Sequence, residues 1–390
     1  MNERANFEAL TARVIATRKI PVCTPFLNGR EKEYVLDAVA STWISSRGSY
    51  LDRFEREFPA YVGVRYGTAT PNGTVALHLA LRALGVGPRD EVILPTFTMI
   101  ASALAICYCG ATPVLLDADP DDWNLNVEQL KGALSSRTKA IMVVHIYGHP
   151  TEMGAVLDFA RENGLAVLED AAEAHGSEYD RQRCGSMSEI ACFSFFANKN
   201  ITCGEGGMVV TDDQDLYDKL RYYKNLCFPL GNTRVYDHRD IGFNYRMSNL
   251  HAALGCAQLE KIDEYVAMRR RNASLYRERL CSIPGLQLPI ERPWAKNTYW
   301  MYGLLCKPEF GHSRDILMSK LAEFGVETRT FFKPMHLQEA IVKYGFRAPY
   351  PMPVAEALGR DGMYLPSSSN LNLEEIEYIS DCIERIHRSR

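Results

Sequence analysis

The sequence predicts an α/β fold, in which a mostly parallel seven-stranded sheet is followed by a smaller C-terminal α+β domain. Short apolar or β-branched runs recur along the first half of the chain, and helix-length amphipathic stretches separate most of them. Strands that alternate with helices form mostly parallel sheets with helices on both faces. The expected strands are residues 66–70, 92–94, 113–116, 140–144, 166–168, 191–195 and 208–211.

The helices expected around this sheet are amphipathic, except for an apolar stretch at 99–109 that we expect to be a core helix. A long helical pattern runs from 247 to about 280 and contains the basic run 269–271, which we interpret as a solvated helix face. The other expected elements are helices at 74–84, 151–163, 213–223, 313–324 and 373–386, and weaker strands near 299–305 and 326–332.

Length and pattern together suggest how the chain is divided. The 390 residues, 46% of them hydrophobic, are enough for two domains with a large core. We expect an N-terminal arm at residues 1–20, a large domain at 21–255 and a small C-terminal domain at 256–390.

Charge and cysteine content narrow the class of protein. The net charge of −4 gives no reason to expect nucleic acid or an anionic membrane as a partner, and no apolar run reaches the roughly 20 residues of a membrane span. The eleven cysteines form no CxxC pair and have no metal-type spacing. Without a recognisable signal peptide, they indicate reduced thiols in the cytoplasm and no metal site.

One lysine stands out among the polar residues. Lys199 follows the apolar strand 191–195 and precedes the glycine-rich turn 204–207. A lysine at the polar end of a buried strand is costly to desolvate unless its charge is lost or paired. A neutral lysine amine is the nucleophile that forms a Schiff base with an aldehyde, so Lys199 is the candidate catalytic residue.

Asp170 supplies a second requirement of the aldehyde cofactor pyridoxal phosphate. It follows the apolar run 165–168, and ligands in open α/β sheets gather beyond the carboxyl ends of strands. A carboxylate there can keep the cofactor's ring nitrogen protonated, which makes the ring an electron sink. Taken alone, Asp170 could equally cap a following helix. Lys199 beyond the next strand favours the cofactor hypothesis.

Four segments carry a resemblance to a known family. They are DAAEAHG at 170–176, FSFFANK at 193–199, GEGG at 204–207 and GFNYRM at 242–247. From about residue 25 to its end, the chain resembles the DegT/DnrJ/StrS-type nucleotide-sugar aminotransferases. The resemblance implies a fold-type I (aspartate aminotransferase-like) enzyme with one antiparallel strand in its sheet. It also implies pyridoxal phosphate, L-glutamate as amino donor and a homodimer with shared active sites.

The turn at residues 72–74 opens the helix after the first strand, where a glycine and free N–H groups suit an anion. We therefore expect the amides of Gly73 and Thr74 to bind the cofactor phosphate, although an ordinary strand-to-helix turn is the alternative. The resemblance adds Ser194 as a donor to that phosphate, and Asn244 as a donor from the neighbouring subunit.

Three further roles follow from the resemblance. Glu173 is expected near the cofactor's phenolic oxygen with a shifted titration, the alternative being a solvated helix residue. Met99 stands where relatives carry an aromatic residue stacked on the cofactor ring, with Phe97 as a possible replacement. Lys199 is expected both to bind the cofactor and to move the substrate proton. A related dehydratase branch has histidine at this position, so Lys199 argues against dehydration.

The substrate residues are implied by the resemblance alone. Trp43 and Ser45, next to Ser46, are expected to line the nucleotide-sugar entrance with Arg329 and His336. The alternatives are packing for Trp43, a surface ion pair for Arg329 and a structural loop role for His336. TWISS at 42–46, HIYG at 145–148 and NTYWM at 297–301 are most similar to the GDP-perosamine synthase branch.

The resulting functional hypothesis is transfer of an amino group from L-glutamate to the 4-keto carbon of a nucleotide-linked 4-keto-6-deoxyhexose. GDP-4-keto-6-deoxymannose, giving GDP-perosamine, is the expected substrate. Amination at C3, or of a UDP- or dTDP-sugar, stays open, as does a non-catalytic binding protein of the same fold. A dinucleotide dehydrogenase is disfavoured because no G-x-G-x-x-G follows the first strand.

Overall fold

The computed structural model describes residues 19–231 and 236–389. The expected N-terminal arm therefore lies outside the described residues, apart from Lys19 and Ile20. Ile20 is buried and forms a bridge with Val326, so the chain is already anchored at that point.

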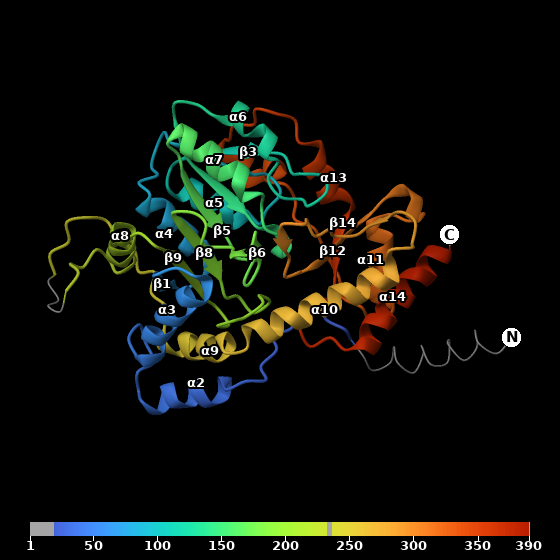
Figure 1. Ribbon diagram of the computed structural model, residues 1–390, viewed down its shortest axis with the longest axis horizontal. Coiled ribbons are helices and arrows are strands. Elements are labelled where there is room, and N and C mark those ends of the chain that lie inside the picture. The colour runs from blue at the N-terminus through green and yellow to red at the C-terminus, as the bar shows by residue number, and fades with distance from the viewer. Residues whose placement is uncertain (1–18, 232–235, 390) are drawn as a thin grey trace.

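A seven-stranded sheet forms the centre of the molecule, as the sequence predicts (Figure 1). Its strand order is β1-β9-β8-β5-β4-β2-β3, and β9 is the one antiparallel strand among them. This confirms the mixed sheet that the family resemblance implies. The strands are β1 (Tyr66–Thr70), β2 (Glu91–Pro95), β3 (Thr112–Leu116), β4 (Thr138–Val144), β5 (Ala166–Asp170), β8 (Ile190–Ser194) and β9 (Gly207–Thr211).

Helices cover both faces of this sheet because alternate strand residues point to opposite sides. In β4, Met142 packs into the core under one helical layer, and Ile141 packs into the core under the other. The first layer contains α4 (Gly73–Ala83), α5 (Ile100–Tyr108) and α8 (Gln214–Lys224). The second contains α3 (Ser49–Val62), α6 (Leu130–Ala133) and α7 (Met153–Asn163).

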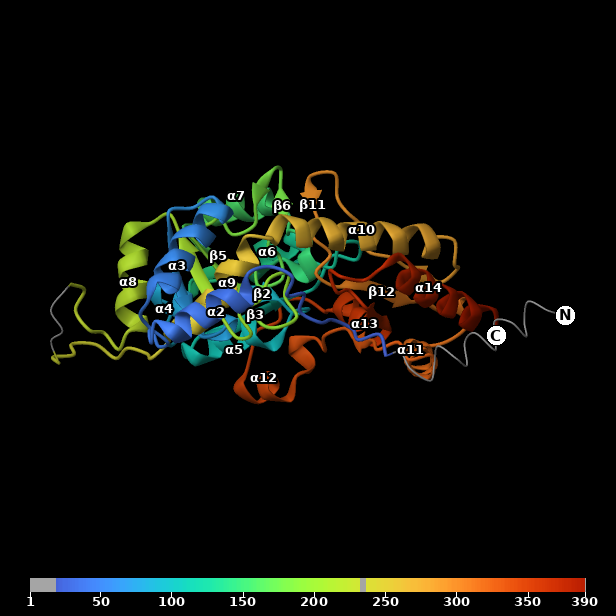
Figure 2. The ribbon, with the colours of Figure 1, turned by 90° about the horizontal axis from the view of Figure 1, so that it is seen from below.

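A smaller sheet lies at the other end of the molecule, with its own core. Its strands are ordered β10-β12-β14-β13 and are all antiparallel. The long helix α10 (Ile262–Leu280) runs from beside the large sheet to this end, where it packs on α14 (Leu373–Arg388) (Figures 1 and 2). The strands are β10 (Leu286–Gln287), β12 (Tyr302–Cys306), β13 (Arg329–Thr330) and β14 (Gly362–Leu365).

The remaining elements are short or lie at the edges. They are α2 (Glu31–Ala40), α9 (Asn249–Leu259), α11 (Arg314–Glu323), α12 (Glu339–Tyr344), α13 (Pro353–Asp361), the small sheet of β6 (Glu178–Tyr179), β7 (Gln182–Arg183) and β11 (Ala295–Lys296), and the 3₁₀ turns η1 (Val127–Gln129), η2 (Ile146–Gly148), η3 (Pro308–Phe310) and η4 (Met335–Leu337). All eleven cysteines are free. In the part of the chain that is described, no helix is long and apolar enough to cross a bilayer.

The continuous helix expected from 247 to about 280 is wrong, because the chain forms two helices, α9 and α10. Glu260 and Lys261 close the end of α9 with hydrogen bonds to the carbonyls of Cys256 and Gln258. The two helices pack on different partners: α9 lies against α2 and α3, whereas α10 lies against α14. A change of direction between them lets each bury its own apolar face.

The expectation that residues 269–271 form a solvated face is wrong for Arg269. Its guanidinium is buried and donates to the carbonyl of Trp300 at 2.6 Å, the carbonyl of Ser367 at 2.7 Å and Ser369 Oγ at 3.1 Å. A buried charge is tolerated when its donors are satisfied in this way. Arg269 thus ties α10 to two loops of the C-terminal half.

Candidate active site

The carboxyl ends of the parallel strands bring the candidate residues to one edge of the large sheet. Asp170 ends β5, Ser194 ends β8 and Gly73 begins α4 directly after β1. Lys199 lies in the loop between β8 and β9. The strand alternation read from the sequence therefore correctly predicts that these candidate residues lie at one edge of the sheet.

Asp170 is a buried carboxylate with two hydrogen bonds. Its Oδ2 accepts from Ser102 Oγ at 2.7 Å, and its Oδ1 accepts from the amide of Ala172 at 3.2 Å. Burial raises the pKa of Asp170 above its usual value. The alternative that Asp170 caps a helix is wrong, because residues 171–176 form turns and the next element is β6.

Lys199 is largely buried, beside a carboxylate and an aromatic face. Its Nζ lies 4.0 Å from Glu173 Oε1 and 3.7 Å from the centre of the Trp300 ring. Burial lowers the pKa of Lys199 and raises the pKa of Glu173 to about 7. Attraction between the two charges would shift both pKa values the other way, so loss of hydration outweighs it. The pair is therefore displaced towards a neutral amine and a neutral acid.

Glu173 is a buried site residue, so the alternative of a solvated helix residue is wrong. The amide of Tyr147 donates to Glu173 Oε2 at 2.8 Å. This bond orients the carboxylate so that its other oxygen faces Lys199.

The turn before α4 forms a close contact with the end of β8. Asn72 caps α4 by accepting from the amide of Val75 at 3.1 Å, and its carbonyl accepts from the amide of Ala76. The amides of Gly73 and Thr74 have no hydrogen-bond partner among the described residues, as is usual in a first helical turn. A Cβ on Gly73 would lie 2.8 Å from Ser194 Cβ, so only glycine allows the turn to approach Ser194 this closely.

Met99 is 46% exposed and precedes α5, where its sulfur accepts from the amide of Ala101 at 3.0 Å. Phe97, the possible replacement for a stacking ring, is completely buried against Phe331 and Tyr147. It therefore cannot replace Met99 as a cover of this edge without leaving the core.

Among the described residues, no hydrogen bond or ion pair joins an expected substrate residue to Lys199. The carbonyls of Trp43 and Ser45 accept from Asn249, which anchors their loop, with Ser46, to the start of α9, and the Trp43 ring is 57% exposed. Arg329 forms an exposed ion pair with Glu327. His336 Nδ1 lies 2.8 Å from Thr96 Oγ1, and its Nε2 lies 3.4 Å from Glu356 Oε1.

Asn244 has partners other than Ser194 within its own chain. It is exposed, pairs with Asn225 just after α8 and accepts from Arg246 Nε at 2.7 Å. The described residues on either side of the gap at 232–235 extend away from the large sheet beyond α8 (Figure 1).

Sequence reasoning missed three residues of the site. Ser102 and Trp300 lie inside motifs read from the sequence, but only the fold shows that they contact Asp170 and Lys199. Arg269 lies in the basic run 269–271, and a charge pattern alone does not distinguish a buried guanidinium from a solvated one.

Comparison with known proteins identifies the family to which this edge of the sheet belongs. Residues 25–384 match the DegT/DnrJ/EryC1/StrS aminotransferase family. The chain belongs to that family. It is a pyridoxal phosphate-dependent aminotransferase.

Individual relatives cover nearly the whole chain. GDP-perosamine synthase of Escherichia coli O157:H7 is 43% identical over 372 residues, which are 95% of this chain and 99% of the relative. GDP-perosamine synthase of Caulobacter vibrioides is 42% identical over 369 residues, which are 94% and 98% of the two chains. The solved structure of Streptomyces venezuelae DesV with a ketimine intermediate superposes with a TM-score of 0.86 at 32% identity, covering 98% of this chain and 96% of that one.

The residues present fit this cofactor. A desolvated lysine amine, a buried carboxylate and a glycine cradle beside a hydroxyl lie along one sheet edge. The lysine amine suits the cofactor's aldehyde, the carboxylate suits its ring nitrogen, and the glycine turn with its neighbouring hydroxyl suits its phosphate.

Proposed function

We propose that this aminotransferase moves an amino group from L-glutamate to the 4-keto carbon of GDP-4-keto-6-deoxymannose and so forms GDP-perosamine. Near full-length identity of 39–43% to three GDP-perosamine synthases carries the proposal of substrate. The presence of Lys199 beside Glu173 supports turnover over mere binding, because a binding protein has no need of a lysine nucleophile.

Several residues besides Lys199 and Glu173 are proposed to bind and orient the cofactor. The amides of Gly73 and Thr74 and the hydroxyl of Ser194 bind the phosphate, Asp170 pairs with the ring nitrogen, and Met99 covers the ring. Ser102 fixes the Asp170 carboxylate through its hydrogen bond. Once bound, pyridoxal phosphate supplies the carbonyl that accepts the amine and the ring that withdraws electrons.

Lys199 and Glu173 are proposed to handle protons. Lys199 binds the cofactor, and its freed amine then carries the proton from the substrate carbon, as a base and afterwards as an acid. Glu173, whose pKa of about 7 lies near neutrality, contacts the cofactor's phenolic oxygen and exchanges a proton with it. Trp300 covers the opposite side of the amine and excludes water from it.

For the sugar nucleotide, we propose that Trp43 and Ser45 line the entrance and that Arg329 contacts an oxyanion. Their exposure leaves them accessible to a ligand. We propose that His336 faces the hexose with its Nε2, which is buried without a hydrogen-bond partner among the described residues, while Thr96 holds its Nδ1.

Further proposals concern assembly, location and division of the chain. A homodimer would bring Asn244 of each subunit to the phosphate of the other, and the exposed Leu36 and Val39 of α2 suit a subunit contact. A cytoplasmic location agrees with the eleven free thiols. We propose the division into a large domain at 21–255 and a small one at 256–390.

Product analysis tests the proposed function. The purified protein is incubated with pyridoxal phosphate, L-glutamate and GDP-4-keto-6-deoxymannose, with UDP- and dTDP-4-keto-6-deoxyglucose in parallel. A 4-amino product of the GDP sugar alone is expected. Amination of another nucleotide sugar would agree with the enzyme class but overturn the proposed substrate. Amination of none of these sugars would overturn the proposed function.

A further inference from the structure

A buried turn that the proposed chemistry does not use lies directly behind Glu173. It is η2, which follows β4 and has Tyr147 at its centre. The Tyr147 amide donates the 2.8 Å hydrogen bond to Glu173 Oε2 that leaves Oε1 facing Lys199. The position of this one amide therefore decides where the carboxylate points.

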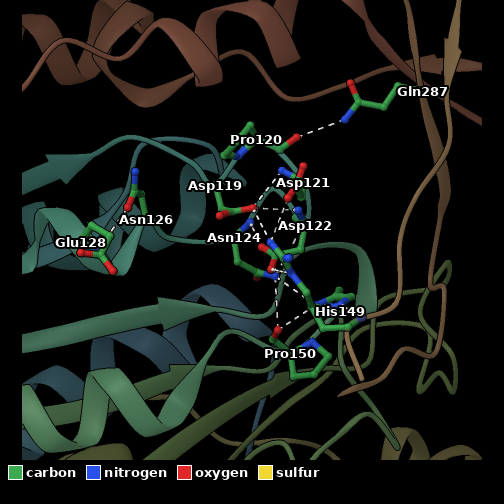
Figure 3. Close-up of polar contacts among 11 residues, drawn as sticks. Asp119, Pro120, Asp121, Asp122, Asn124, Asn126, Glu128, His149, Pro150 and Gln287 are labelled. Carbon is green, nitrogen blue, oxygen red and sulfur yellow. Dashed lines mark hydrogen bonds and ion pairs between the residues drawn. The ribbon is translucent and has the colours of Figure 1, made fainter. Parts of the chain in front are cut away.

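The backbone at Tyr147 needs restraint to keep that position. Its φ is 51°, a left-handed value that bulky residues adopt rarely and only where the surrounding structure holds them in it. Asn124 Oδ1 accepts from the amide of Ile146 at 3.1 Å, and Ser177 donates to the carbonyl of Gly148 at 2.6 Å. Figure 3 shows Asn124 within the cluster of polar contacts that joins the Asp119–Asp122 loop to His149 and Pro150.

His145, the residue before this turn, is hydrogen-bonded through both ring nitrogens and its backbone amide. Its Nδ1 accepts from the amide of Thr151 at 3.0 Å, so the ring's hydrogen must be on Nε2. Nε2 then donates to Glu169 Oε2 at 3.1 Å. The backbone amide of His145 donates to the carbonyl of Asp170 at 3.2 Å. One neutral imidazole thus joins β4, the turn and β5.

Glu169 makes a rigid anchor for this imidazole. It is completely buried and also accepts from the amides of Gly185 at 2.6 Å, Met187 at 3.0 Å and Ser188 at 2.9 Å. Burial opposes its ionisation, but the hydrogen bonds from His145 and from these donors hold the pKa of Glu169 below its usual value. A carboxylate with this many donors does not rotate, so His145 cannot either.

We infer that His145 is a positioning residue for the reaction, which acts through the Tyr147 turn to hold the Glu173 carboxylate beside Lys199. The inference rests on the proposed function, since Glu173 matters only where the cofactor binds. Without the imidazole, the turn is free to relax from its positive φ, and the Tyr147 amide leaves Glu173. The carboxylate then rotates away from the amine.

The test compares His145→Ala, Glu173→Gln and the double variant, all loaded with pyridoxal phosphate. The readout is the visible absorbance of the bound cofactor as a function of pH. Glu173→Gln removes a negative charge close to the Lys199 nitrogen. The midpoint pH of the absorbance change should therefore fall. His145→Ala should also lower this midpoint, by about half a pH unit. Its kcat should be about tenfold lower, and its KM should change little. The double variant should match Glu173→Gln alone, because the effect passes through Glu173.

Two controls separate positioning from mere packing. His149→Ala removes a similarly buried imidazole from the other end of the turn, where it contacts Pro150, the amide of Arg292 and the side-chain nitrogen of Asn124. Because the Asn124 oxygen still accepts from the amide of Ile146, this variant should leave the midpoint unchanged. His145→Gln, which can still donate to Glu169, should recover most of the loss, whereas the shorter His145→Asn should not. If His145→Ala fails to fold, the comparison of His145→Gln with His145→Asn still tests whether His145 positions Glu173.

The groups facing Glu173, namely Lys199, Asp170, Tyr147 and Tyr364, are unchanged in every His145 variant. Additive effects in the double variant, or a folded His145→Ala protein with wild-type midpoint and kcat, would overturn the inference. A wild-type protein that gains no visible band with the cofactor would instead overturn the proposed function, before any variant is made.

Discussion

Replacing Arg269 with methionine should destabilise the protein far more than any exposed arginine of the same helix. Methionine keeps much of the apolar stem but removes the donors that reach the carbonyls of Trp300 and Ser367. Each buried carbonyl left without a donor costs about 1–3 kcal/mol, or about 2–6 kcal/mol for two. Removing the guanidinium also removes the desolvation penalty of a buried charge, which offsets part of that cost. We therefore expect the free energy of unfolding to fall by about 2–4 kcal/mol.

Arg279→Met is the matched control for Arg269→Met. Arg279 lies on α10 as well, but it is exposed and pairs with Glu377 and Asp381 at the surface. Surface pairs contribute about 0–1 kcal/mol, so this variant should unfold close to wild type. The stability of both variants is measured by urea unfolding, followed by fluorescence and circular dichroism at one protein concentration. An Arg269→Met loss no larger than that of Arg279→Met would refute the reasoning.

Three further predictions concern the site. Lys199→Ala should lower turnover by about 100-fold or more while leaving the circular dichroism spectrum intact, and a variant of wild-type activity would exclude the lysine from catalysis. Gly73→Ala should weaken binding of pyridoxal phosphate about tenfold in a fluorescence titration, because the new Cβ would lie 2.8 Å from Ser194 Cβ. Gly87→Ala, whose Cβ would meet only Arg82 Nη1 at 3.9 Å, is its control and should bind normally. Burial raises the pKa of Glu173 from 4.5 to about 7, so its contribution to stability is present below pH 4.5 and is lost as the pH rises through about 7. Unfolding of the cofactor-free protein across that range should show Glu173→Gln gaining stability relative to wild type, and a constant difference would contradict the buried titration.

The large sheet was predictable because its strands are short β-branched or apolar runs. The bounds of each predicted run differ from those of an observed strand by no more than two residues. The site followed from the same pattern. Asp170 and Lys199 come after strands whose carboxyl ends share one edge of the sheet, so their proximity required no knowledge of side-chain packing.

The parts that the sequence did not predict depend on contacts between distant segments. The break between α9 and α10 reflects two different packing partners, which a continuous helical pattern does not reveal. Arg269 and Arg279 occupy one helix, and only the loops around Trp300 and Ser367 make the first of them buried. His336 likewise contacts Thr96 and Glu356, neither of which is near it in the sequence.

The enclosure of Lys199 is assembled from parts that leave the ribosome at very different times. Glu173 and the lysine itself are synthesised with the large sheet, whereas Trp300 follows α10, and Ser367, which anchors Arg269, comes close to the end of translation. Because the N-terminal part of a nascent chain folds first, the sheet can form while the amine is still open to water. In a chain cut short before Trp300, Lys199 would lack the ring that lies 3.7 Å from its amine, so its enclosure is complete only late in translation.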